Sequence, residues 1–115
     1  MYRVLISEAS QNKIDDYSNY LWEYYDRLFD DTGLGYAEDI IKKQYKQSTD
    51  ILRDNIYDSI ENTLSLDTLY GYSFDSIEQV YTITLPIWTR RLFIRYKEYP
   101  ETHTRLVIDI SIIRK

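Results

Sequence analysis

The sequence predicts an α+β fold in which two helices pack on one face of a four-stranded, mainly antiparallel sheet. Three observations lead to this class. Two long stretches in the first half carry apolar residues at helical spacing, and the chain after residue 80 is rich in β-branched and aromatic residues. No internal repeat or linker divides the 115 residues. We therefore expect one domain, residues 1–115, in the order strand, helix, helix, strand, strand, strand.

The first strand and both helices are expected before residue 62. Residues 2–7 form a short β-rich run that ends at Ser7, a favourable residue for capping a helix N-terminus. A first helix near residues 8–29 follows from apolar residues spaced three and four apart, at Ile14, Tyr17, Leu21, Tyr24 and Leu28. Two nearby glycines end this helix. A second helix is expected near residues 36–61, where the apolar stripe is interrupted by polar positions.

Three strands are expected after residues 62–79, which lack a clean period and are interpreted as a structured loop. The strands are residues 80–85, 87–97 and 105–113. Side chains alternate along a strand, so one face of the second strand carries the core residues Leu92, Ile94 and Tyr96. The opposite face carries Arg91, Phe93, Arg95 and Lys97. In the last strand we expect Leu106, Ile108, Ile110 and Ile112 in the core, opposite Arg105, Val107, Asp109, Ser111 and Ile113.

The net charge of −5 is the sum of two unlike parts. Residues 1–78 hold sixteen acidic and seven basic residues, whereas residues 79–115 hold three acidic and seven basic ones. The sign of a local field decides which ligands are attracted to a surface. The sequence therefore predicts an acidic helical part, interpreted mainly as solvated helix faces, and a basic sheet.

The composition excludes several classes of site. The chain has no Cys and a single His, so it can form neither a disulfide, nor a thiolate or His-rich metal site, nor a cysteine nucleophile. We expect no metal and no cofactor. No apolar stretch is long enough to span a membrane. The N-terminus turns polar too early for a signal peptide, and we expect a soluble, cytoplasmic protein without a membrane partner.

Basic residues around an aromatic residue on the uncovered sheet face are the candidate binding site. Cations neutralise phosphate or acidic protein groups, and an exposed ring offers a contact surface. The candidate binding residues are Arg91, Phe93, Arg95, Lys97, Arg105, Asp109 and Arg114. In the competing interpretation, the arginines are structural partners of Asp109 and Glu98. No catalytic residue can be assigned, since His103 is interpreted as a bystander in a loop.

Four stretches of the sequence resemble the RelE/ParE superfamily of bacterial toxin–antitoxin toxins. They are residues 2–10, 35–41, 90–96 and 107–115, which read YRVLISEAS, GYAEDII, RRLFIRY and VIDISIIRK. The resemblance implies the fold described above. RelE-type members cleave messenger RNA on the ribosome, often with a His or Tyr near the C-terminus, and ParE-type members act on DNA gyrase. Both kinds are neutralised by a cognate antitoxin protein.

Two departures from the nuclease pattern favour a protein-directed inhibitor. The chain ends Ile113-Arg114-Lys115 without a terminal His or Tyr, and it is acidic overall. The favoured hypothesis is thus a toxin-like inhibitor that binds a gyrase-type protein through the open sheet face. A RelE-type endoribonuclease acting on ribosome-bound mRNA stays open. A second alternative is a phage or mobile-element protein that uses the fold as a docking surface or nucleic-acid mimic. The chain can also form a homodimer under any of these hypotheses.

Overall fold

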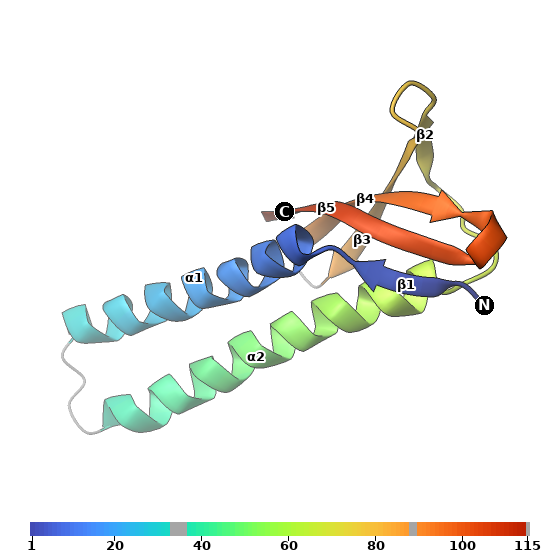
Figure 1. Cartoon of the computed structure of the whole chain (residues 1–115). Helices are drawn as coiled ribbons and strands as arrows, with labels where there is room; N and C mark the ends of the chain where they lie inside the picture. The colour runs from blue at the N-terminus through green and yellow to red at the C-terminus, as the bar shows by residue number, and fades with distance from the viewer. Residues whose placement is uncertain (33–36, 88–89, 115) are drawn as a thin grey trace.

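Two long helices and a five-stranded sheet make up the protein in the computed structural model (Figure 1), which describes the backbone of residues 1–32, 37–87 and 90–114. The elements in chain order are β1 (Arg3–Ile6), α1 (Glu8–Thr32), α2 (Ala37–Leu64), β2 (Ser73–Asp75), β3 (Val80–Ile87), β4 (Arg90–Tyr99), a 3-10 turn (Pro100–Thr102) and β5 (Thr104–Arg114). The α+β class is confirmed. Both helices are a few residues longer at their C-termini than the apolar spacing predicted.

The sheet has the strand order β1-β5-β4-β3-β2. β1 lies parallel to β5, and the other neighbouring strands are antiparallel. The prediction of four strands was wrong by one, because β2 lies within the segment expected to be a loop. Its three residues pair with residues 80–82 of β3, and so short a run gives no periodic signal. β3 also continues through Pro86 to Ile87, which was predicted to begin the next strand, and residues 88–89 lie outside the described residues.

The helices lie side by side below the sheet and extend well past it (Figure 1), which gives the molecule extents of 57 × 25 × 23 Å. α1 begins as predicted, because the Ser7 hydroxyl accepts a hydrogen bond from the Ser10 N–H at 3.2 Å. The core lies where the start of α1 and the end of α2 meet the sheet. Its fully buried residues include Ile14, Ile56, Ile60, Leu64, Leu92 and Ile94. In the described part of the chain, no helix is long and apolar enough to cross a membrane.

A β-bulge divides the last strand into two halves with opposite alternation. In β4, the predicted core residues Leu92, Ile94 and Tyr96 are buried, as expected. The register between β4 and β5 shifts between Arg95, opposite Asp109, and Tyr96, opposite Val107. The extra residue at a bulge moves all following side chains to the other face. The prediction for the last strand was therefore right for residues 109–113 and wrong for residues 105–108.

Candidate functional site

The sheet face opposite the helices, named here the open face, carries a row of side chains from β4 flanked by those of β3 and β5. The row is Arg91, Phe93, Arg95 and Lys97, with Arg91 exposed and the others half-buried. Thr84 lies beside Phe93 on β3, and Ser111 lies beside it on β5. Neither helix covers this face (Figure 1). The structure thus brings together four of the predicted binding residues as the alternation required.

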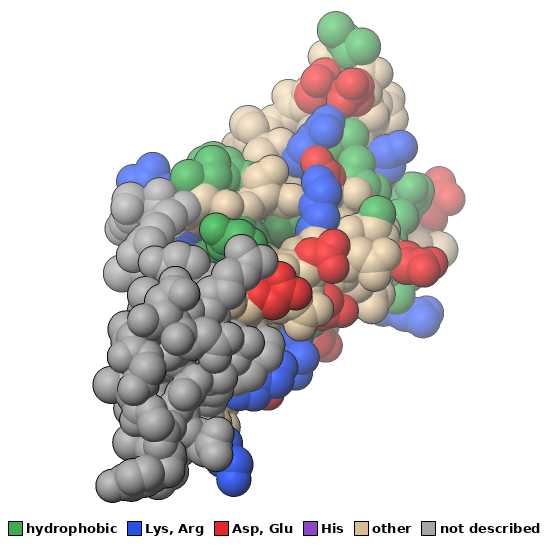
Figure 2. Space-filling model, turned by 90° about the vertical axis from the view of Figure 1, so that its left-hand side faces the viewer, with side chains coloured by type: hydrophobic (Ala, Val, Ile, Leu, Met, Phe, Trp, Pro, Cys, Tyr) green, Lys and Arg blue, Asp and Glu red, His purple; other side chains and the backbone are tan. Residues whose placement is uncertain are grey.

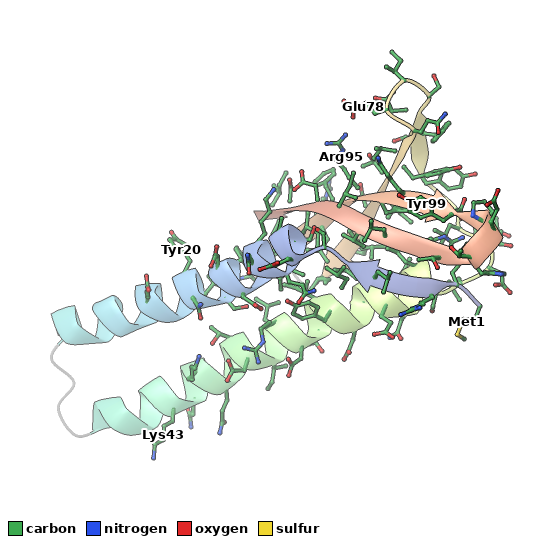
Figure 3. All side chains as sticks on the ribbon, in the orientation of Figure 1. Met1, Tyr20, Lys43, Glu78, Arg95 and Tyr99 are labelled. Atoms are coloured by element: carbon green, nitrogen blue, oxygen red, sulfur yellow. The ribbon has the colours of Figure 1, made fainter. Side chains whose placement is uncertain are left out.

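Two of the cations on the open face are held by acidic partners. Arg95 donates from Nη2 to Glu78 Oε2 at 2.6 Å, and Figure 3 shows the two side chains pointing toward each other. Lys13 of α1 forms an ion pair with Asp109 beyond the end of β1. Arg91 and Lys97 form no ion pair with any side chain that the structure describes. These two cations are therefore available to a partner.

The lysine contact changes the titration of the Asp109 carboxyl. The hydrogen bond from Lys13 lowers the pKa of Asp109 below its ordinary value, and the charges of Lys13 and Arg95 lower it further, against a smaller effect of desolvation. Asp109 is thus ionised at neutral pH. Above the helices in Figure 2, basic and acidic side chains alternate along the surface of the sheet. The open face is accordingly a mixed charged surface with an excess of cations.

Arg105 was predicted on the open face, and this prediction was wrong. The bulge turns Arg105 to the helix side of the sheet, opposite Glu98, and its exposed fraction is 3%. Its Nε donates to Glu98 Oε1 at 2.9 Å, and its Nη1 donates to the carbonyl of Leu64 at 2.7 Å and to that of Leu66. The guanidinium also lies 3.7 Å from the ring centroid of Tyr2.

Arg105 is therefore a structural residue that completes α2. The last carbonyls of a helix have no partner within the helix, and α2 has no basic residue in its last turn. Arg105 supplies both the hydrogen bonds and the positive charge that a helix C-terminus favours. The competing interpretation of the sequence, in which an arginine pairs with Glu98, was right for this residue. The predicted binding residue Arg114 has its side chain outside the described part of the structure.

The single histidine lies at the other end of the sheet from Arg91. His103 precedes β5, where its ring contacts Tyr2 with a centroid distance of 4.1 Å and its Nε2 lies 3.4 Å from Asp67. Arg91 is opposite Ile113, nine residues further along β5 than Thr104. At about 3.3 Å per strand residue, this separates the two sites by about 30 Å. His103 cannot serve as a general base beside Arg91.

A pocket of about 230 Å³ lies beside Arg105, between Tyr2 at the N-terminus, strands β4 and β5, and the loop after α2. Its lining includes Tyr2, Leu69, Tyr72 and Tyr96, together with Glu98 and Arg105. Burial raises the pKa of the Tyr96 hydroxyl to about 12, so that it stays protonated at neutral pH. Within the described residues, no three His, Asp or Glu side chains are placed to hold a metal ion.

Sequence reasoning missed two residues of the open face, Lys13 and Glu78. Lys13 is 96 positions away from its partner Asp109, and no local pattern in the helix indicates this contact. Glu78 lies in the segment interpreted as a loop, and it reaches Arg95 because the hairpin of β2 and β3 turns there.

No family model matches the chain, and no curated protein sequence or solved structure is significantly similar to it.

Proposed function

We propose that the chain is a toxin-like inhibitor that binds a protein target through the open face. The observation that carries this proposal is the row Arg91, Phe93, Arg95 and Lys97, which no helix covers and in which Arg91 and Lys97 are not paired with any described side chain. Unpaired cations around a half-buried ring favour association with a surface that presents acidic and apolar groups. Apart from the additional strand β2, the element order, with a helical hairpin between β1 and the later strands, agrees with the order that the resemblance to RelE/ParE toxins implies.

The charges of the open face favour a protein over RNA as the target. Glu78 and Asp109 lie among the cations, each in contact with one of them. A phosphate backbone is uniformly negative and meets repulsion from both carboxylates. A protein surface can present acidic and basic groups in matching positions. The position of His103, about 30 Å from Arg91 along β5, also favours binding over cleavage. The target class proposed from the resemblance is DNA gyrase, with a cognate antitoxin as the neutralising partner.

Two activity assays with the purified chain test the proposal. Inhibition of DNA supercoiling by purified gyrase supports it, whereas cleavage of mRNA in a ribosome-dependent translation reaction supports the nuclease alternative. Arg91→Glu together with Lys97→Glu should reduce gyrase inhibition at least about tenfold, because charge reversal in an interface opposes association. Lys43→Glu is the matched control, because Lys43 is exposed on α2, far from the sheet (Figure 3).

Two outcomes contradict the proposal. One is the absence of gyrase inhibition by a folded chain, and the other is full inhibition by the folded double variant. Induced expression in bacteria adds a test of the toxin class. Growth arrest that is relieved by co-expression of a neighbouring gene supports a toxin with an antitoxin.

A further inference from the structure

The pocket beside Arg105 lies on the helix side of the sheet and has no role in the proposed function. Its volume is about 230 Å³, and it opens between the loop after α2 and the strands β4 and β5. Met1 marks this end of the molecule in Figure 3, far from the tips of the helices. A site for a drug-sized ligand measures about 300–1,000 Å³, so this pocket suits a smaller molecule. Its lining includes Tyr2, Tyr72, Tyr96, Glu98 and Arg105.

Three tyrosine hydroxyls in the lining have no hydrogen-bond partner among the described residues; they belong to Tyr2, Tyr72 and Tyr96. The Tyr96 hydroxyl is the most informative, because the exposed fraction of this residue is only 1%. In the described part of the chain, Ser18 Oγ is the one fully enclosed side-chain nitrogen or oxygen atom without a partner. The Tyr96 hydroxyl is therefore not enclosed, and the pocket gives access to it. Buried hydroxyls are normally hydrogen-bonded, so a ligand in the pocket can supply the missing partner.

The tyrosine rings around the pocket are held by contacts of their own. The ring of Tyr96 stacks on that of Tyr81, with the centroids 5.3 Å apart and an angle of 13° between the planes. The Arg105 guanidinium lies over the ring of Tyr2, 3.7 Å from its centroid. Tyr72 meets Tyr81 edge to face at 5.4 Å. Because these contacts use ring faces, the pocket offers a ligand mainly hydroxyl groups rather than rings for stacking.

The charged groups of the lining already have partners of opposite charge. Arg105 Nε donates to Glu98 Oε1 at 2.9 Å, and the Asp67 carboxylate lies 2.8 Å from the N-terminal amine of Met1. A charged ligand therefore finds no unbalanced opposite charge in the pocket, and an uncharged one is favoured. The other carboxylate oxygen of Glu98 forms no hydrogen bond with a described residue. It can accept a hydrogen bond from an uncharged donor.

The polar groups of the pocket lie close to one another. Burial raises the pKa of Tyr81, and the neighbouring Glu98, Tyr72 and Tyr2 raise it further, whereas Arg105 lowers it. Electrostatic effects of this kind weaken with distance, so the hydroxyls and the ion pair gather around one space. We infer that the pocket binds a small, uncharged cyclic polyol such as a pentose or a hexose. Its hydroxyl groups both donate and accept hydrogen bonds, so they accept from the tyrosine hydroxyls and donate to Glu98 at the same time.

NMR titrations of the full isotope-labelled chain test the inference, which does not depend on the proposed function. The probes are D-ribose, D-glucose and myo-inositol. At least one of them should shift the amide signals of residues 67–72, 96–98 and 105 in a saturable manner. Cyclohexanol is the control, because it keeps a six-membered ring but carries a single hydroxyl. It should bind at least about tenfold more weakly, since a site that hydrogen-bonds hydroxyls rejects analogues that lack them.

Variants that remove one hydroxyl complete the test. Tyr96→Phe keeps the stacked ring but removes the unpartnered hydroxyl, and it should weaken binding of the polyol about threefold or more. Tyr20→Phe is the matched control, because Tyr20 is exposed on α1 (Figure 3), and it should leave binding unchanged. If Tyr96→Phe does not fold by circular dichroism, Tyr72→Phe replaces it with the same expected loss, because the ring of Tyr72 is half exposed.

Four results would overturn the inference. They are the absence of saturable shifts with all three polyols, equal affinity for cyclohexanol, shifts that map to the helices or the open face, and unchanged affinity in the hydroxyl variant. Inorganic phosphate, tetramethylammonium and uracil are titrated in parallel. Tighter binding of one of these would assign the pocket to an anion, a cation or a planar heterocycle instead.

Discussion

Replacing Arg105 should destabilise the protein more than any other change of a single charge among the residues described above. The side chain is 97% removed from solvent and donates to Glu98 and to the carbonyls of Leu64 and Leu66. Arg105→Met fills a similar volume but leaves a half-buried carboxylate without its partner. It also removes the donors to the carbonyl of Leu64, the last residue of α2, and to that of Leu66 just beyond the helix.

The size of the effect follows from these contacts. Removing one partner of a buried ion pair costs about 3–5 kcal/mol, because the other charge stays desolvated. The Glu98 side chain keeps an exposed fraction of 20%, which places the expected loss near the lower end, about 3 kcal/mol. Arg105→Lys keeps the charge but not the planar fork that reaches several acceptors at once, and we expect about half of this loss. Arg91→Met, at an exposed position, should cost less than about 0.5 kcal/mol.

Urea unfolding followed by circular dichroism measures these differences as shifts of the midpoint at constant slope. A double variant, Arg105→Met with Glu98→Gln, provides the internal control. It should be less destabilised than the two single losses added together, because no unpaired charge remains. If Arg105→Met lowers stability by no more than Arg91→Met does, the role assigned to Arg105 is refuted.

Three further outcomes are expected. Burial raises the pKa of Tyr96 to about 12, above the ordinary value of about 10. The stability that this shift contributes is therefore complete below pH 10 and is lost as the pH rises toward 12. In urea unfolding at several pH values, the free energy of unfolding of Tyr96→Phe should fall less between pH 10 and 12 than that of the unchanged protein. Ile56→Ala should cost about 2–5 kcal/mol, because Ile56 is fully buried, whereas Ile51→Ala on the same helix should cost little; equal costs would contradict the assignment of the core. Lys13→Met should raise the pKa of Asp109, measured by NMR titration of its carboxyl carbon, since the lysine is the main cause of its lowering.

The elements of this fold follow from local patterns in the sequence, and so do most of their faces. Helical spacing located α1 and α2 because apolar residues recur along their inner faces despite some polar positions, and Ser7 marked the start of α1. Alternation placed Leu92 and Ile94 in the core and Arg91 and Phe93 on the open face, because β4 is regular from residue 90 to residue 95. Helical spacing and strand alternation depend only on residues that are close in the chain, so both can be recognised from the sequence.

The last strand, the short strand and the partners of the charges depended on tertiary structure. A bulge is a mismatch between two strands, and it is not encoded in the alternation of either, so Arg105 and Val107 could not be assigned to the core from β5 itself. The three residues of β2 form a strand because they pair with β3. The ion-pair partners of Asp109 and Arg95 on the open face come from α1 and from the turn between β2 and β3. Such contacts join residues far apart in the chain, and their energies depend on geometry that only the folded backbone creates.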